Sequence, residues 1–292
     1  MELLPAILKP EQKTRIVDVG SAAIDGPPPY AFMRGSGLCT VVGFDPQTDL
    51  HPKQDSAFES YFPHVIGDGS AGHLLIRKAP GMTGLFAVDE DVFDLFPGMR
   101  RWCELVRSEP VVTRRLDDIR AVDRIDLLKV DAQGSELGVI QSAAAKLKDA
   151  VFVQLEVQFV RLYRDAPMFA DLMTSMERRG FMLHTFSQAD HRMILPYTYP
   201  ADPDHAAMHQ LFSADAVFVR DLTKMDGLET EAVKHMGLIA HYCYSSFDLT
   251  YRCIDHLERR HVLPAGEADR YMQSLAAAEE KPAERAENGQ WW

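Results

Sequence analysis

Residues 125–136 read IDLLKVDAQGSE, and this stretch decides the fold. It begins as a short apolar run that ends at the carboxylate of Asp131. A glycine and a serine follow, and after them the apolar residues from Leu137 to Leu147 recur as one helical stripe. An apolar strand that leads directly into a helix is typical of a parallel sheet covered by helices.

Similar apolar runs alternate with helical patterns along the first two thirds of the chain. They lie at 16–20, 40–46 and 151–157, with a weaker run at 64–69. A helix is expected from about Phe169 to Met176, with Gly180 as its stop. Extra strands are expected at 74–77 and 111–113 and a final pair at 181–186 and 216–219. No helical pattern lies between that final pair, so we expect it to be antiparallel at the sheet edge.

The domain organisation changes after Arg220, where the pattern becomes helical. The chain has 292 residues, which suggests about two units. We expect an α/β domain over residues 1–222 and a helical extension over 223–280. Residues 281–292, which contain Lys281-Pro282 and Asn288-Gly289, are expected to be a disordered tail.

Charge and cysteine content restrict the partners and the compartment. A formal net charge of −12 repels a phosphate backbone, which argues against nucleic acid. The four cysteines are far apart in the sequence, as is usual for reduced thiols in the cytosol. The N-terminus lacks the pattern of a signal peptide, and 18 consecutive apolar residues occur nowhere. These features predict a soluble cytoplasmic protein without a membrane partner.

A glycine turn and an acidic residue mark the ends of the first two strands. Gly20 and Ser21 follow the first strand, and Asp45 ends the second strand 25 residues after Gly20. An acid at this place commonly binds ribose hydroxyls. The G-x-G-x-x-G pattern of a dinucleotide site is absent, which disfavours NAD. The pattern indicates a nucleoside site, although a glycine turn can also serve packing alone.

Three charged residues on the fourth and fifth strands are candidates for catalysis. Lys129 and Asp131 are two residues apart and therefore leave the same face of the strand. A lysine in a covered strand needs a partner for its charge, and Asp131 is the nearest candidate. Glu156 is expected at the same sheet edge. Such a cluster can take a proton from a hydroxyl group, but it can equally be a structural ion pair.

Other polar groups are weaker candidates. A metal site could be built from Asp202, Asp204, His205 and His209, but a solvated loop is the favoured interpretation, so no metal is predicted. Arg192 lies in a loop expected over the site. The stretch 86–102 mixes acids with aromatic residues, as a lid or a subunit contact would.

The stretch 125–136 resembles the signature of the FkbM family of S-adenosylmethionine-dependent methyltransferases. Further pieces between Thr14 and Arg220 follow in the order found in that family, namely 17–20, 43–46, 66–68, 80–83, 115–118, 156–157, 162–163, 179–181 and 214–220. The resemblance implies a Rossmann-like seven-stranded methyltransferase sheet with helices on both faces. It also implies S-adenosylmethionine as cofactor.

The resemblance assigns roles to eight residues. It places Asp18, Gly20 and Ser21 against the methionine part of the cofactor. It places Asp45 at the ribose hydroxyls and Asp68 near the adenine. Lys129, Asp131 and Glu156 are expected to face the methyl group that is transferred.

The activity implied is O-methylation of a sugar, a glycan or a small natural-product-like metabolite. Two departures from the family pattern stand out: the first loop is long and runs into Pro27-Pro28-Pro29, and Gln133 replaces a frequent glutamate. They leave open a second interpretation, a catalytically inactive domain that acts as a binding or scaffold protein through its helical tail. The C-terminal helices could also form a homodimer.

Overall fold

The computed structural model describes residues 3–24, 26–52, 57–201 and 208–279. The chain forms two compact units, Gln12–Leu228 and a helical unit that joins Met1–Glu11 to Glu229–Trp292. The first residues of the chain therefore group with the C-terminal helices, whereas the sequence placed them in the α/β domain. The predicted tail at 281–292 lies outside the described residues.

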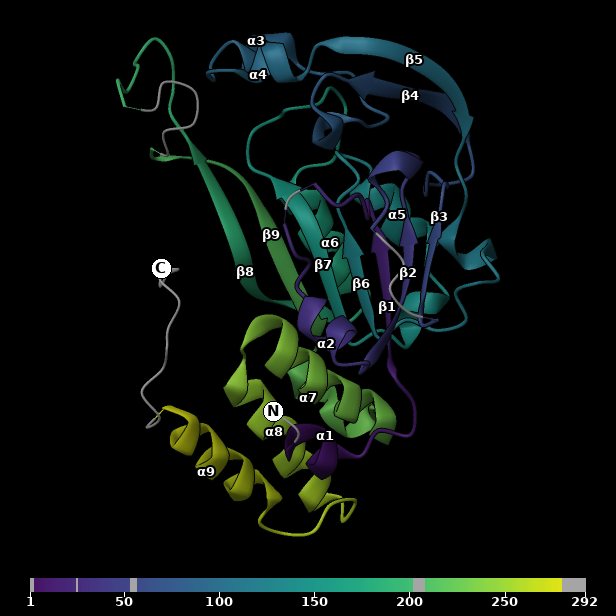
Figure 1. Ribbon diagram of the computed structural model, residues 1–292, viewed down its shortest axis with the longest axis vertical. Helices are drawn as coiled ribbons and strands as arrows, with labels where there is room; N and C mark the ends of the chain where they lie inside the picture. Colours follow the sequence, from purple (N-terminus) through teal and green to yellow (C-terminus); the bar gives the residue numbers. More distant parts are fainter. Residues whose placement is uncertain (1–2, 25, 53–56, 202–207, 280–292) are drawn as a thin grey trace. The chain divides into compact units, whose positions relative to one another are not determined.

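A seven-stranded sheet is the centre of the α/β unit (Figure 1). Its order is β3-β2-β1-β6-β7-β9-β8. The strands are β1 (Thr14–Val19), β2 (Cys39–Phe44), β3 (Glu59–Phe62), β6 (Leu127–Val130), β7 (Phe152–Gln158), β8 (Phe181–Arg192) and β9 (Gln210–Arg220). The first five are parallel to one another, and β9 is antiparallel to both β7 and β8. This arrangement confirms the predicted α/β class and the antiparallel pair at the edge.

Helices cover both faces of the sheet. One face carries α5 (Glu136–Ser142) and α6 (Phe169–Arg178), whose buried residues form one core with Val17 and Val19 of β1. Neighbouring residues of a strand point to opposite faces. Asp18 accepts a hydrogen bond from Tyr30 at the start of α2 (Ala31–Gly35), so α2 lies on the other face.

A segment inserted between β3 and β6 forms a separate layer above the strand ends. It contains an antiparallel ribbon of β4 (Ala71–Arg77) and β5 (Leu105–Val112), together with α3 (Glu90–Phe93) and α4 (Met99–Trp102). Its apolar residues form a second core with Tyr163 and Phe212. Short 3-10 helices complete the unit at Thr48–Leu50, Pro80–Met82, Leu116–Asp118, Lys146–Lys148 and Leu222–Gly227. The ribbon contains both extra strands expected from the sequence.

Three boundaries differ from the sequence prediction. The third strand is Glu59–Phe62, and the predicted run at 64–69 is a turn in which Gly69 has a φ of +94°. The stripe expected to continue to Leu147 leaves the α-helix at Ser142 and ends in a 3-10 turn. The final two strands extend into the predicted loop, because they pair with each other as far as Arg192 and Gln210.

The helical unit contains α1 (Leu3–Leu8), α7 (Thr230–Tyr244), α8 (Phe247–Arg259) and α9 (Glu267–Glu279). The α1 side chains of Leu4, Ile7 and Leu8 are buried. Two contacts join the segment after α1 to α7: the Glu11 amide donates to Glu231 at 2.8 Å, and Lys234 Nζ donates to the Lys9 carbonyl at 3.1 Å. These contacts explain why the first residues belong to this unit.

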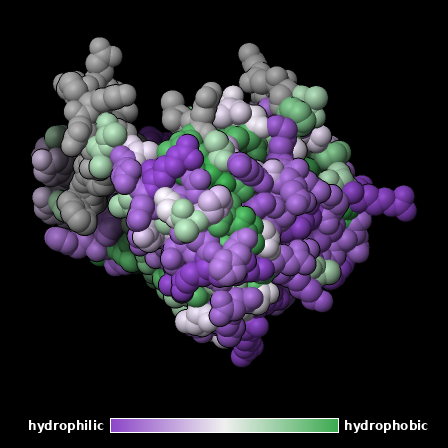
Figure 2. Space-filling view, turned by 90° about the horizontal axis from the view of Figure 1, so that it is seen from below, coloured by the Kyte–Doolittle hydropathy of each residue, from purple (hydrophilic) through white to green (hydrophobic). Residues whose placement is uncertain are grey.

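The helices and the surface bear on the membrane prediction. Of the helices within the described residues, none combines the length and the apolar character that a membrane crossing requires. Hydrophilic residues cover most of the face seen in Figure 2, with hydrophobic residues in smaller patches between them.

Candidate functional site

The carboxyl ends of the parallel strands bring the predicted residues to one edge of the sheet. Gly20 follows β1, Asp45 follows β2 and Asp131 follows β6. The Asp131 amide donates to the Val19 carbonyl at 2.9 Å, which continues the pairing of β1 with β6. Leu155 of β7 is in register with Val130, so the following residues, Glu156 and Asp131, are neighbours.

A narrow crevice of about 50 Å³ lies at this edge. Its lining includes Gly20, Asp45, His64, Asp131 and Ser135. Gly20 has a φ of +81°, and a Cβ atom there would lie 1.8 Å from the Asp131 carbonyl oxygen. Only glycine fits both the left-handed backbone and this close approach.

Polar groups line the crevice as a nucleoside would require. Asp45 is buried, and its Oδ1 accepts the Gln47 amide at 2.7 Å. Burial raises the pKa of Asp45, while this hydrogen bond lowers it. Within the described part of the chain, the buried hydroxyl groups of Ser21 and Ser135 have no hydrogen-bond partner. Two groups therefore face the same crevice: the Asp45 carboxylate, which can accept hydrogen bonds from ribose hydroxyls, and the buried Ser135 hydroxyl.

The residues thus fit the chemistry of the adenosine part of S-adenosylmethionine, but the volume of the crevice is small. Ligand sites are usually about 300–1,000 Å³, well above the 50 Å³ found here. The crevice is walled by His64–Ile66 and by Thr83–Leu85. A nucleoside needs more room than these walls leave.

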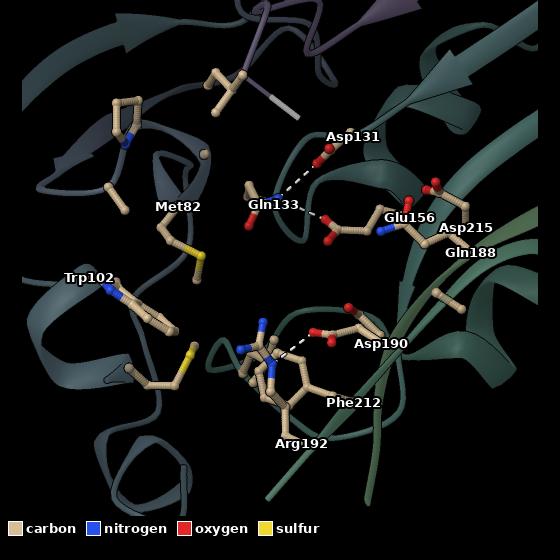
Figure 3. A pocket seen from close by; sticks show the side chains of 18 residues that line it. Met82, Trp102, Asp131, Gln133, Glu156, Gln188, Asp190, Arg192, Phe212 and Asp215 are labelled. Carbon is tan, nitrogen blue, oxygen red and sulfur yellow. Dashed lines mark hydrogen bonds and ion pairs between the residues drawn. The ribbon is translucent and has the colours of Figure 1, made fainter. Parts of the chain in front are cut away.

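A larger cavity of about 440 Å³ (Figure 3) shares one lining residue, Asp131, with the crevice. One side of the cavity carries carboxyl and amide groups from strands β7, β8 and β9 and from the turn after β6, namely Asp131, Gln133, Glu156, Gln188 and Asp215. The opposite side comes from the inserted segment and includes Met82, Met99 and Trp102. Met99 and Trp102 belong to the stretch 86–102, which was expected to be a lid or a subunit contact. That part of the inserted segment thus supplies a wall of the cavity.

The side chain of Gln133 connects the two central carboxyl groups. Its Nε2 donates to Asp131 Oδ1 at 2.7 Å and to Glu156 Oε2 at 2.8 Å (Figure 3). Its Oε1 accepts the hydroxyl of Tyr163 at 2.6 Å. Burial raises the pKa of Glu156 well above its usual range, and the neighbouring Asp131 raises it further. Both effects favour the protonated form of Glu156.

An aromatic wall faces these carboxyl groups. The guanidinium of Arg192 lies 5.7 Å from the centre of the Trp102 ring and 5.2 Å from that of Phe212. Arg192 Nε is also paired with Asp190 at 2.8 Å. The cavity therefore offers a flat apolar surface on one side and hydrogen-bonding groups on the other. The sequence had placed Arg192 over the site, and the structure shows it in the cavity lining.

Four of the eight predicted residues, Gly20, Asp45, Asp131 and Glu156, line the crevice or the cavity. A fifth, Ser21, directly follows Gly20. The other three, Asp18, Asp68 and Lys129, are not among the described residues that line the crevice or the cavity.

Lys129 and Asp18 form a buried ion pair behind the site. The sequence paired Lys129 with Asp131, but Lys129 Nζ lies 3.3 Å from Asp18 Oδ1. The reason is register, because Asp18 is the cross-strand neighbour of Lys129. Burial lowers the pKa of Lys129, but the carboxylates of Asp18 and Asp131 raise it above its ordinary value. These carboxylates therefore favour the charged ammonium form of Lys129.

Asp68 is separated from the other predicted cofactor residues. Its Oδ1 accepts the backbone amide of Ser70 at 2.8 Å, and its side chain is exposed to solvent. It lines a different surface hollow, together with Arg114 and Arg115. His64, four residues earlier in the chain, lines the crevice. Because the third strand ends at Phe62, position 68 lies six residues beyond the sheet edge.

Several cavity residues had weak or no signals in the sequence. Gln133 was visible only as a departure from a family pattern. Ser135 looked like the start of a helix, which it also is. Asp215 and Gln188 belong to antiparallel strands whose register could not be read from the sequence.

Metal ligation has no support in the structure as described. Among the described residues, no group of three or more histidine, cysteine, aspartate or glutamate side chains could hold a metal ion. Of the weighed ligands, Asp202, Asp204 and His205 lie outside the described residues.

Comparison with known proteins gives one strong match. Residues 18–183, more than half of the chain, match the model of the methyltransferase FkbM domain. A search of curated proteins finds no match.

Solved structures of methyltransferases are similar at low identity. A TehB-like SAM-dependent methyltransferase from Corynebacterium glutamicum is 14% identical, with a TM-score of 0.34 over 75% of this chain and 85% of that one. Magnesium protoporphyrin IX methyltransferase from Synechocystis, solved with bound SAM, is 9% identical, with a TM-score of 0.33 over 75% of this chain and 78% of that one. The assignment of this chain depends on the family match and not on these structures.

Proposed function

Because the chain belongs to the FkbM family of methyltransferases, whose methyl donor is S-adenosylmethionine, we propose that it methylates a hydroxyl group. The acceptor we propose is a sugar, a glycan or a small natural-product-like metabolite. The observation that carries this proposal is the position of Asp131, which lines both the crevice and the larger cavity. A reaction between two bound molecules needs such a meeting point.

The side chains present suit the removal of a proton from a hydroxyl. S-adenosylmethionine supplies a methyl group already activated by its sulfonium. When the acceptor oxygen forms its bond to the methyl carbon, the sulfur–methyl bond breaks and the hydroxyl proton has to leave. A carboxylate at this place, from Asp131 or Glu156, can accept that proton. Asp45 would hold the ribose, and the Gly20 turn admits the cofactor close to the backbone.

The cavity lining supports a polyhydroxylated acceptor. Trp102 lines the cavity and is only partly buried, so its ring provides a flat surface on which the apolar face of a sugar ring can pack. Gln188 and Asp215 on the opposite side can bind hydroxyl groups. The surplus of carboxylates in the lining disfavours an anionic acceptor, because like charges repel.

A transfer assay tests this function. S-adenosylmethionine with a labelled methyl group is incubated with neutral sugars, glycans, phenolic metabolites and uronic acids as separate acceptors. We expect label in a neutral hydroxylated acceptor and an ether linkage in the product by NMR. We expect Asp131→Asn to lower kcat by about 10²-fold or more, the usual contribution of a general base. Transfer to a nitrogen, or no transfer to any acceptor, would contradict the proposal. The inactive scaffold interpretation predicts the latter result.

A further inference from the structure

The backbone at Gln133 is held in an unusual conformation. Its φ is +51°, in the left-handed region that residues other than glycine seldom adopt. Such a conformation persists where the surroundings hold it in place. The loop at Gly84 packs against it so closely that a Cβ atom on Gly84 would lie 3.0 Å from the Gln133 Cβ. The side chain therefore leaves the turn toward the cavity (Figure 3).

The chemistry of the contacts requires an amide. Both N–H groups of Gln133 are used, one on Asp131 and one on Glu156. The Tyr163 hydroxyl donates to the amide oxygen and so determines which end of the amide faces the carboxyl groups. Burial and the nearby Glu156 raise the pKa of Tyr163, so its hydroxyl keeps the proton that it donates. An ionised glutamate at position 133 could donate to neither carboxyl group.

The same hydrogen bonds offset the electrostatic repulsion between the two adjacent carboxyl groups. Asp131 is close enough to Glu156 to disfavour its ionised form. A neutral donor placed between them offsets this repulsion without adding charge. A third carboxylate in its place would increase the repulsion.

We propose that Gln133 is a positioning residue for methyl transfer: its amide, oriented by Tyr163, holds the carboxyl groups of Asp131 and Glu156 at the acceptor hydroxyl. The kinetic part of this inference rests on the proposed function. The hydrogen-bonded network is a property of the resting protein and can be tested without an acceptor.

The first test is a titration of the carboxyl groups by NMR in the full-length protein labelled with ¹³C at glutamate side-chain carboxyls. The Glu156 signal is assigned by its loss in Glu156→Gln. We expect Gln133→Glu to raise the pKa of Glu156 by about one unit or more, because a negative charge replaces two donors. Gln133→Met removes the donors without adding charge, so its rise should be smaller. The additional glutamate signal that Gln133→Glu introduces is identified by its absence from the spectrum of Gln133→Met.

Gln188→Met is the matched control, because Gln188 lines the same cavity and, within the described residues, has no hydrogen bond to either carboxyl group. We expect it to leave the Glu156 titration unchanged. An unchanged Glu156 titration in the two Gln133 variants would overturn the network. If Gln133→Glu fails to fold, Gln133→Met, which keeps size and neutrality, decides the question alone.

The second test is the pH dependence of kcat with the acceptor found in the transfer assay. We expect both Gln133 variants to lower kcat about tenfold or more, the effect of losing charge-assisted hydrogen bonds. The acid limb should move to higher pH, most in Gln133→Glu. Affinity for S-adenosylhomocysteine should stay within about threefold, because Gln133 does not line the crevice.

The outcomes separate the two proposals. An unchanged kcat and acid limb in the Gln133 variants would overturn the positioning role. If the wild-type protein methylates no acceptor, the proposed function fails, and the titration still decides whether Gln133 holds the two carboxyl groups.

Discussion

Replacing Gly20 by alanine tests the closest approach in the site. The new Cβ would lie 1.8 Å from the Asp131 carbonyl oxygen, whereas ordinary contact begins at 3.4 Å. The carbonyl therefore has to move by about 1.6 Å, although the amide of the same residue is hydrogen-bonded to the Val19 carbonyl of β1. The left-handed backbone adds about 1–2 kcal/mol for alanine, and a forced shift in a packed region adds about 1–3 kcal/mol. We expect a loss of about 2–5 kcal/mol in the free energy of unfolding.

Gly26 provides the matched control for this variant. It has a similar φ of +89°, but a Cβ atom there would meet nothing within 4 Å. Gly26→Ala should therefore lose only the backbone part, about 1–2 kcal/mol. At roughly 2–4 °C per kcal/mol for a unit of this size, Gly20→Ala should melt about 4–20 °C below the wild type.

Differential scanning calorimetry, with urea unfolding to obtain the free energies, measures the difference between the two variants. Gly20→Ala should also weaken binding of S-adenosylhomocysteine about tenfold or more, because the displaced carbonyl belongs to Asp131. Equal losses of stability in Gly20→Ala and Gly26→Ala would refute the argument from close approach.

Three further predictions follow from the site. Asp45→Ala should weaken S-adenosylhomocysteine binding by calorimetry about tenfold or more, whereas Asp68→Ala, which removes an exposed carboxylate, should change it less than about threefold; equal effects would contradict the assignment of the crevice. Glu136 is buried and its pKa is raised from 4.5 to about 7. Between pH 4.5 and 7 the folded state therefore keeps a proton that the unfolded state has lost, so the free energy of unfolding falls as the pH rises through this window. Relative to Glu136→Gln, wild type should lose about 3 kcal/mol in unfolding free energy from pH 4.5 to 7, and parallel stability curves would exclude this linkage. Trp102→Leu keeps apolar packing but removes the flat ring, so acceptor KM should rise about tenfold at unchanged S-adenosylhomocysteine affinity; an unchanged KM would remove Trp102 from the acceptor surface.

The sequence predicted the strands that are buried on both faces. The run that contains β6 lies in the middle of the sheet, and continuous apolar residues are the signal of such strands. By contrast, β3 is an edge strand in which three of four residues are only partly buried. It therefore has no continuous apolar run, and the apolar Val65 and Ile66 beyond it attracted the prediction instead.

Some contacts of the site could be predicted from the sequence, and others depend on the register between strands. Asp131 and Glu156 could be placed together because adjacent parallel strands end at the same edge. The pairing of Lys129 with Asp18 depends on which residues face each other across two strands that are 111 positions apart in the chain. The bridging role of Gln133 depends on a left-handed turn that no sequence pattern indicated.

The most direct test of the account is a crystal structure of the protein with S-adenosylhomocysteine. We predict that the ribose hydroxyls bind Asp45 and that the sulfur lies beside Asp131, which lines both the crevice and the larger cavity. One of the loop segments, His64–Ile66 or Thr83–Leu85, should be displaced outward. A ligand bound elsewhere, or a ligand in the crevice whose sulfur lies away from Asp131, would contradict the assignment of the methyl-transfer site.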